Sequence, residues 1–549
     1  MKKLLTLLIA VVVPGILIAG GLVTNTNQSA AWVRMPSRNA STSIDAVNYN
    51  PAGLMKLENG FHFSVSNQTI FQKRKVENFY RWLNDTLFTG DVKAPIFPGI
   101  YAAYKMDRLA IWAGFNPIGG GGGAEYKEGL PSFELSISDL VPALASQNVT
   151  GYRLDSYLKG SSVYFGIQGG VSFKINDWLS VAAGLRYVIA NNSYVGHLKD
   201  VELQQGSNWV RADAILNGIA SQLTAITTIP TQLSPIISAG GGNFTIAQLV
   251  AAGQMTVQQQ QAIYAALGVV GVPSSNIPLM TVNQISGTIT AASPTLLANA
   301  AKYSATATVL GDQEADVKQT GSGISPIFSV NISPSENLNI AIRYEMKTSM
   351  QLENKTTKDF LVGFTETGTP ITMFPDGILT PSDMPAMLAL GLDYSASDNL
   401  RLSCGLNYFF DKNADYGHKI DHDLKSTTPS IFISNKEIIK HNGWSLSCGA
   451  EYGLSEKLLL SGGYSFANKG VNDKYQSDLT FGLATHTLGA GGAYKITENI
   501  LLNAGFSYTF YMKDRVSINH MSPAGIIFQP DETYHKNAMV IGVGVDFSF

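Results

Sequence analysis

Strict two-residue alternation of apolar and polar side chains over long stretches most constrains the fold of this chain. Within residues 161–175 every odd position from Val163 to Ile175 is apolar or glycine, and the even positions are polar or small. The same alternation recurs at 400–410, 444–454, 500–510 and 539–549. A transmembrane β-strand needs about 9–11 residues, whereas strands of soluble sandwiches average about five or six. Such segments predict a transmembrane β-barrel, with one face of each strand toward lipid and the other toward the lumen.

Composition narrows the choice of protein class further. The 549 residues carry 38 basic and 41 acidic side chains, so the charged fraction is only 14% and the net charge is −3. Disordered chains combine high charge with few aromatic residues, whereas a tenth of this chain is aromatic. A nucleic-acid-binding protein needs a basic excess, which this chain lacks. Beyond the N-terminus no uncharged apolar run reaches about 18 residues, which excludes a bundle of transmembrane helices.

The first 21 residues have the pattern of an export signal. Lys2 and Lys3 form a positive start, residues 4–18 are apolar, and Ala19 to Gly21 supply the small residues of a cleavage zone. A transmembrane anchor is the alternative, but the apolar stretch is short and no stop-transfer charges follow it. Residues 1–21 are therefore predicted to be the signal peptide of an exported protein.

Two classes of connection separate the predicted strands. Six short polar turns lie near 106–108, 176–178, 333–337, 397–399, 455–457 and 497–499. Seven longer connections lie near 76–94, 119–160, 199–315, 354–384, 413–440, 469–481 and 515–535. Short turns on the periplasmic side and long loops outside are typical of bacterial barrels. Six turns and seven loops join fourteen strands over 60–549, with both chain ends periplasmic, and leave residues 22–59 as a separate segment.

The alternation also assigns a face to individual side chains of the barrel wall. Leu402, Leu446, Leu488, Leu502 and Val543 are expected to face lipid, and Arg186, Arg343, Arg401 and Glu451 the lumen.

Residues 22–59 carry the resemblance to a known family. The runs Asn27-Gln28-Ser29-Ala30-Ala31, Arg38-Asn39-Ala40-Ser41-Thr42 and 45–54 resemble the N-terminal hatch of the FadL-type long-chain fatty-acid transporters of the outer membrane, together with the toluene/xylene transporters. Asn50, Pro51 and Ala52 fall where that family has its hatch motif. Gly323 to Lys355, Met384-Pro385-Ala386 and the closing strand ending on Phe549 also follow family order, whereas the long 199–315 connection departs from it.

This resemblance implies a 14-stranded antiparallel outer-membrane β-barrel in a Gram-negative bacterium, plugged by residues 22–59 as a hatch. It implies a monomer among outer-membrane lipids that needs no cofactor and passively takes up long-chain fatty acids or similar hydrophobic molecules. Phe549 is similar to the terminal aromatic residue that the barrel-assembly machinery recognises. The family releases its ligand sideways into the membrane through a gap caused by a kinked third strand. We expect Asn50 to bond to wall backbone near Pro117, since buried amides need partners.

The third predicted strand contains the residues expected to form such a kink. Asn116 and Pro117 precede a glycine run that starts at Gly119. Proline lacks the donor of a ladder hydrogen bond and is confined to edges or bulges, and a closed barrel has no edge. Pro117 therefore either breaks the wall locally or simply ends the strand.

Two long connections are candidates for capturing the ligand. In the 119–160 loop, Ser138 is a possible helix cap, and an apolar face is expected from Leu135, Ile137, Leu140, Val141 and Leu144. An exposed face of this kind would attract acyl chains, although packing against neighbouring loops is the more common outcome. The second connection has no charge from Ala214 to Ala301 and shows helical spacing of its apolar residues, with Thr256 as a possible cap of 257–267. Its role stays open.

An ionised ligand carboxylate inside a narrow lumen needs a cation. Arg186 and Arg343 lie on the lumen phase of their strands, and the arginine fork can hold both carboxylate oxygens. The alternative is that both arginines pair with lumen acids such as Glu345 or Asp393 and only stabilise the barrel.

The remaining patterns give no support for catalysis. The sequence has no nucleophile-elbow, Walker or zinc-protease motif, so neither an enzyme nor a metal site is predicted. Cys404 and Cys448 are expected on the lipid face, as wall residues or as a cross-strand disulfide. The alternative function is a barrel of the same family reused as a scaffold or protein-binding component of a secretion apparatus. A lumen path behind the hatch favours transport, and a sealed lumen favours the scaffold.

Overall fold

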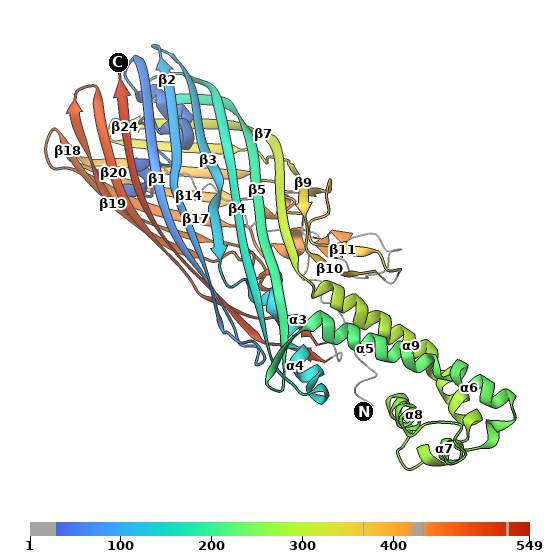
Figure 1. Cartoon of the computed structure of the whole chain (residues 1–549). Coiled ribbons are helices and arrows are strands. Elements are labelled where there is room, and N and C mark those ends of the chain that lie inside the picture. Colours follow the sequence, from blue (N-terminus) through green and yellow to red (C-terminus); the bar gives the residue numbers. More distant parts are fainter. Residues whose placement is uncertain (1–28, 366, 418, 421–430, 433–434, 523–525) are drawn as a thin grey trace.

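The computed structural model describes residues 29–549, except 366, 418, 421–430, 433–434 and 523–525. The predicted signal peptide, residues 1–21, lies outside the described residues. Fourteen antiparallel strands close into a barrel (Figure 1), which confirms the predicted fold class. These strands are β1 (Gly60–Asn78), β2 (Leu87–Lys105), β3 (Leu109–Tyr126), β4 (Val149–Lys174), β5 (Leu179–Gln205), β7 (Gln313–Ser335), β8 (Leu338–Glu345), β13 (Met387–Ser397), β14 (Leu400–Phe409), β17 (Trp444–Gly453), β18 (Leu458–Asn468), β19 (Thr485–Thr497), β20 (Ile500–Tyr511) and β24 (Asp531–Ser548).

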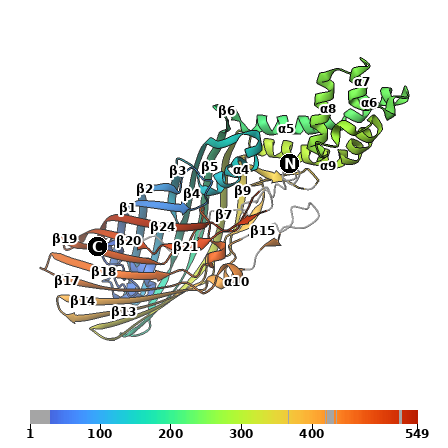
Figure 2. The same cartoon turned by 90° about the horizontal axis from the view of Figure 1, so that it is seen from below.

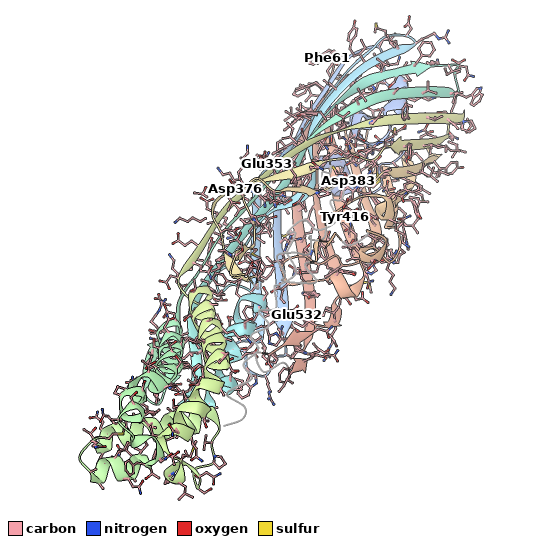
Figure 3. All side chains as sticks on the ribbon, turned by 90° about the vertical axis from the view of Figure 1, so that its right-hand side faces the viewer. Phe61, Glu353, Asp376, Asp383, Tyr416 and Glu532 are labelled. Atoms are coloured by element: carbon pink, nitrogen blue, oxygen red, sulfur yellow. The ribbon has the colours of Figure 1, made fainter. Side chains whose placement is uncertain are left out.

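The barrel closes between its first and last strands. β24 pairs with β1 in an unbroken antiparallel register from His62 opposite Ser548 to Asn78 opposite Glu532. All six predicted short turns join neighbouring strands at one end, here called the turn end, and the longer connections gather at the other, the loop end. In Figure 3, Phe61 marks the turn end, and Glu532 lies far from it near the loop end.

Alternation along the strands places apolar side chains outside and polar ones inside, as predicted. The predicted lipid-facing side chains are exposed on the outer wall: Leu402, Leu446, Leu488, Leu502 and Val543. The predicted lumen-facing charges form ion pairs inside the barrel: Arg186, Arg343, Arg401 and Glu451. Burial therefore follows the two-residue period that membrane strands require.

Neighbouring residues of β19 provide a test of these faces. Leu488 is 53% exposed on the outer face, whereas Thr487 is 7% exposed and lines the lumen. Leu488→Arg should lower the free energy of unfolding by about 2–4 kcal/mol, because a guanidinium near the middle of the bilayer is poorly solvated. Thr487→Arg should cost clearly less. The measurement is urea unfolding in lipid vesicles, and equal costs for the two variants would contradict the assignment of faces.

The N-terminal segment forms a compact plug inside the barrel, near the turn end (blue in Figure 1). It contains helix α1 (Ala30–Arg34), helix α2 (Ala46–Tyr49) and the 3₁₀ helix η1 (Pro51–Lys56). Ser29 caps α1, because its hydroxyl accepts a hydrogen bond from the Trp32 backbone at 3.1 Å. Most of the segment is buried, since the barrel wall surrounds it.

The connection between β3 and β4 differs from its prediction. It contains α3 (Pro131–Ser138), α4 (Leu140–Ala143) and the 3₁₀ helix η2 (Ala145–Gln147). Ser138 ends α3 and donates to the Leu135 carbonyl at 2.7 Å, so it does not cap a following helix. The five apolar residues predicted as an exposed capture face are all buried: Leu135, Ile137, Leu140, Val141 and Leu144. The last four pack in one core with side chains of β4 and β5, so the alternative of packing against neighbouring segments holds and no exposed capture face forms from these residues.

A long helical arm leaves the loop end between β5 and β7. α5 (Ala212–Thr227) and α9 (Val282–Val309) run side by side away from the barrel, and α6–α8 cluster at the far tip (Figure 2). The tip elements are α6 (Ile229–Ser238), η3 (Gly241–Asn243), α7 (Ile246–Ala251), α8 (Val257–Val270) and η4 (Ile277–Leu279). Thr256 caps α8 as predicted, and the arm has a hydrophobic core of its own.

Short elements complete the loop end. They are β6 (Asn208–Arg211), β9 (Gln351–Lys358), β10 (Leu361–Phe364), β11 (Pro370–Thr372), β12 (Leu379–Pro381), η5 (Asp411–Asn413), β15 (Lys419–Ile420), β16 (Ile431–Phe432), α10 (Asn435–Ile438), η6 (Asp473–Tyr475), β21 (Asp514–Ser517), β22 (His520–Met521) and β23 (Ile527–Phe528). Among the described residues, no helix is both long and apolar enough to cross a bilayer.

Candidate transport path

A cavity of about 390 Å³ lies in the lumen between the plug and the loop end. This volume falls in the range of small-molecule sites, about 300–1,000 Å³. Its lining combines plug residues such as Trp32 and Tyr49 with wall residues from both sides of the barrel. The lining contains both apolar side chains, including Leu158, Phe409 and Phe481, and hydroxyl and amide groups, so the cavity suits an amphipathic ligand.

One side of the plug docks on β7 through the residues of the predicted hatch motif. Asn50 donates to Asn331 Oδ1 at 2.7 Å, and Ser329 donates to Asn50 Oδ1 at 3.0 Å. Ser180 donates to the Ala52 carbonyl at 2.8 Å. Asn50 therefore bonds to side chains of β7, and the expected bond to wall backbone near Pro117 was wrong. That prediction failed because the sequence does not reveal which wall strand faces Asn50.

The bonds at Pro51 and Asn48 extend the same docking surface. Ser172 of β4 donates to the Pro51 carbonyl at 2.7 Å. Asn116 of β3, the residue before Pro117, donates to Asn48 Oδ1 at 3.4 Å. The plug thus does contact the third strand, but through Asn48.

The other side of the plug is held by charge. Glu451 of β17 forms ion pairs with two plug residues, Arg34 at 2.6 Å and Arg38 at 3.7 Å between nitrogen and oxygen. It also pairs with Arg401 of the barrel wall. Arg38 in turn makes two hydrogen bonds of 2.9 Å to Asp45 within the plug. Burial raises the pKa of the Asp45 carboxyl, but Arg38 lowers it more, so the net pKa lies below its ordinary value. The Arg38–Asp45 pair therefore stays charged at neutral pH.

The wall beside the cavity is irregular between β2 and β3. Their ladder runs from Lys105 opposite Ala110 to Ile100 opposite Phe115, and resumes only at Val92 opposite Ala124. In the intervening part of β2, Pro95 and Ile96 are both exposed, which breaks the alternation, and Ile96 reaches 76% exposure. Bulges of this kind bend a strand and end regular pairing.

The alternation of β3 is interrupted at the predicted kink residues, and its pairing with β4 shifts register between Pro117 and Gly119. Four consecutive residues are buried there, Asn116, Pro117, Ile118 and Gly119, whereas the strand alternates up to Gly114. Gly120 follows with φ +82°, and a Cβ on it would lie 2.0 Å from the Ser162 carbonyl oxygen, so only glycine fits. Pro117 lies within β3, opposite Phe165 of β4, so it does not end the strand.

Arg186 and Arg343 lie where the alternation predicts, but they do not present free charges to a ligand. Both pair with Glu345, and Arg186 also donates to Gln168 Oε1 at 2.8 Å. The geometry therefore agrees with the alternative of lumen ion pairs that stabilise the wall.

Three other cations line the cavity, and the sequence analysis missed them. Arg74 of β1 lies directly opposite Lys536 of β24, and Lys469 follows β18. No acidic side chain is among the lining residues of the cavity, and none of the three joins an ion pair in the part of the chain that the structure describes. Arg74 and Lys536 lie on the lumen phase of the first and last strands, so the alternation and barrel closure together would have found them.

The two cysteines occupy neighbouring positions on the outer wall. Cys404 of β14 lies directly opposite Cys448 of β17, and both are exposed and free. They are therefore wall residues in this structure. Within the described ranges, no group of three or more histidine, cysteine or acidic side chains is placed to hold a metal ion.

Comparisons with known proteins agree with this architecture. Residues 279–549 match the family model described as "Outer membrane protein transport protein (OMPP1/FadL/TodX)". Among solved structures, a FadL homologue of Pseudomonas aeruginosa superposes with a TM-score of 0.55 at 13% identity, covering 96% of this chain and 100% of that chain. The Pseudomonas putida toluene transporter TodX gives a TM-score of 0.50 at 16% identity, covering 96% and 100%. At these identities the structural likeness shows the fold alone.

A search of curated proteins gave no significant match. The family match and the barrel fold nevertheless agree, and they extend to every strand from β7 to β24. Across residues 279–549 the chain therefore matches the FadL/TodX family of Gram-negative outer-membrane transporters of hydrophobic compounds, which are transport proteins rather than enzymes.

Proposed function

We propose that this protein takes up amphipathic molecules with an anionic head group, long-chain fatty acids among them, and releases them sideways through the wall between β2 and β3. The loop end then faces the exterior and the turn end, with the plug, faces the periplasm. The observation that carries this proposal is the cavity, which is lined by three unpaired cations and adjoins the irregular wall at Gly120. A lumen cavity of this size also favours transport over a purely structural scaffold.

Each part of the proposed route has its own support. Phe481 and Leu158 provide apolar contact for a chain, and the cations can meet its head group. The plug blocks the straight path because it bonds to two separate parts of the wall, to β7 through Asn50 and to Glu451 of β17 through Arg38. The interrupted ladder between β2 and β3 beside Pro117 supports a lateral exit, since ladder bonds that are absent do not have to be broken for release. Asn50, Pro51 and Ala52 then act as the hatch, and Asn116, Pro117 and Gly119 as the kink.

The direct test is uptake by cells that lack other fatty-acid transporters. Expression of the chain should restore uptake of radiolabelled oleate, and Arg74→Gln combined with Lys536→Gln should remove most of it at equal surface expression. Uptake of a neutral hydrocarbon should change little in the same variant. Failure of the unmodified chain to transport either compound would overturn the proposal.

Lys469 should make binding of an anionic ligand depend on pH. Burial lowers the pKa of its amine to about 8, against the ordinary value of about 10.4, and the nearby carboxylate of Asp411 offsets this only in part. The amine is therefore charged at pH 7 and loses its proton as the pH rises through 8. Arg74 and Lys536 are the other unpaired basic side chains that line the same cavity.

Dodecanoate binding to the purified protein should consequently weaken severalfold between pH 7 and pH 9. Lys469→Arg should keep its affinity across this range, because arginine stays protonated. Lys469→Gln should bind weakly at both pH values. Isothermal titration calorimetry checks this, and a pH profile that is the same in all three proteins would remove Lys469 from the site.

A further inference from the structure

The three unpaired cations of the cavity, here called the cation cluster (Arg74, Lys469 and Lys536), exceed what a single carboxylate can balance. Arg74 and Lys536 are direct cross-strand neighbours, an arrangement that is unfavourable for like charges. Lys469 lies close enough to repel Lys536 electrostatically. The chain therefore gathers three basic side chains inside the lumen, where burial and their mutual repulsion disfavour the charged form of Lys536 unless an anion joins them.

The immediate surroundings do not neutralise this charge. Lys536 donates to the Phe481 carbonyl at 2.8 Å and lies 4.3 Å from the centre of the Phe481 ring. Arg74 donates to Gln72 Oε1 at 3.2 Å. These partners are neutral, so they orient the cations without compensating them.

Two acids of the surrounding loops, Asp411 and Asp478, are already engaged in hydrogen bonds elsewhere. Asp411 accepts hydrogen bonds from the Gly443 backbone at 2.7 Å and the Tyr416 hydroxyl at 2.8 Å. Asp478 accepts one from the Ser132 backbone at 2.9 Å, and burial raises the pKa of this carboxyl, which disfavours its charged form. The cluster thus keeps a net positive charge that a ligand can balance.

We propose that the cation cluster binds a head group with two negative charges, as in a phosphomonoester, carried by an alkyl chain. This inference rests on the proposed function and names its ligand class. A phosphomonoester carries about −1.5 to −2 charges at pH 7 and three acceptor oxygens, whereas a carboxylate offers one charge and two oxygens. Three cationic donors from β1, β24 and the segment after β18 match three oxygens. Leu158, Leu483 and Tyr511 line the same cavity and provide contact for the chain.

The experiment compares four ligands on the full chain in a neutral detergent at pH 7.5: dodecyl phosphate, dodecanoate, dodecanol and inorganic phosphate. Calorimetry should show dodecyl phosphate binding at least about tenfold more tightly than dodecanoate, because one more charge is balanced. Inorganic phosphate should bind far more weakly than dodecyl phosphate, since it lacks the chain. Equal affinity for dodecanoate and dodecyl phosphate would overturn the inference and leave the proposed function standing. Tight binding of inorganic phosphate would overturn it too, because the site would then take free phosphate.

Variants distinguish binding of the ligand by the cation cluster from nonspecific attraction by other positive charges. Arg74→Gln and Lys536→Gln should each lower dodecyl phosphate affinity about tenfold, and Arg74→Lys and Lys536→Arg should retain most of it. The matched control is Lys73→Gln, since Lys73 neighbours Arg74 in the same strand but lies near Asp91 on the outer face. An equal loss in Lys73→Gln would contradict the inference. Absence of binding for every dodecyl compound would instead count against the proposed function itself.

Discussion

Ser162→Trp should nearly abolish uptake while leaving the barrel folded. Ser162 lies on β4 opposite Gly122 of β3, within the irregular part of the wall, and it lines the cavity. An indole there would occupy the inner side of the proposed exit. A barrier to passage raised by about 1–3 kcal/mol, the typical cost of steric overpacking, corresponds to a roughly 5- to 150-fold slower passage. Oleate uptake at matched surface expression measures the effect.

The control for this variant carries the same indole on the same strand. Ile167 of β4 is exposed on the outer face, so Ile167→Trp should leave uptake near its normal rate. If both tryptophan variants transported normally, the ligand would not pass between the plug and this part of the wall. Lateral release through β2 and β3 would then have to be abandoned.

Glu451→Gln should release one side of the plug. Glu451 is the shared anion of Arg34, Arg38 and Arg401, so its neutralisation leaves Arg34 and Arg401 without their ion-pair partner and Arg38 with Asp45 alone. Breaking a buried pair by removing one partner costs about 3–5 kcal/mol. We expect a lower melting temperature and, in planar bilayers, an ion conductance that the unmodified protein does not show.

Two further variants serve as controls for the conductance and stability of Glu451→Gln. Glu451→Asp retains the charge and should conduct far less than Glu451→Gln. Glu353→Gln alters an exposed carboxylate of β9 at the loop end (Figure 3) and should leave both stability and conductance unchanged. A closed Glu451→Gln barrel would show that the bonds of Asn50 to β7 are sufficient to hold the plug.

The features that depend on periodicity were predictable from the sequence. Strand positions, the lipid faces and the lumen position of Arg186 follow from alternation, because the side-chain period of a strand is two. Pro117 was also informative, since proline cannot complete a ladder inside a closed wall. The helical spacing around Thr256 correctly gave α8.

The errors concern contacts between distant segments. An exposed and a packed face at Leu140 and Val141 could not be distinguished, because their partners on β4 and β5 are not recognisable as neighbours in the sequence. Arg343 lies on the predicted face. The sequence left open whether it binds a ligand carboxylate or pairs with a lumen acid, and in the structure it pairs with Glu345 of the same strand. Lys469 lies outside the alternating strands, so no periodic pattern marks it.

The short link from η1 to β1 has a kinetic consequence. Only Leu57, Glu58 and Asn59 separate the last residue of the plug from the first strand. A plug that leaves its docking surface therefore stays tethered to the barrel, and a short tether holds it at an effective concentration on the order of millimolar. Opening and closing are then first-order events within one molecule. Their rates should not depend on how many copies the membrane holds, and each passage of ligand can be followed by rapid resealing.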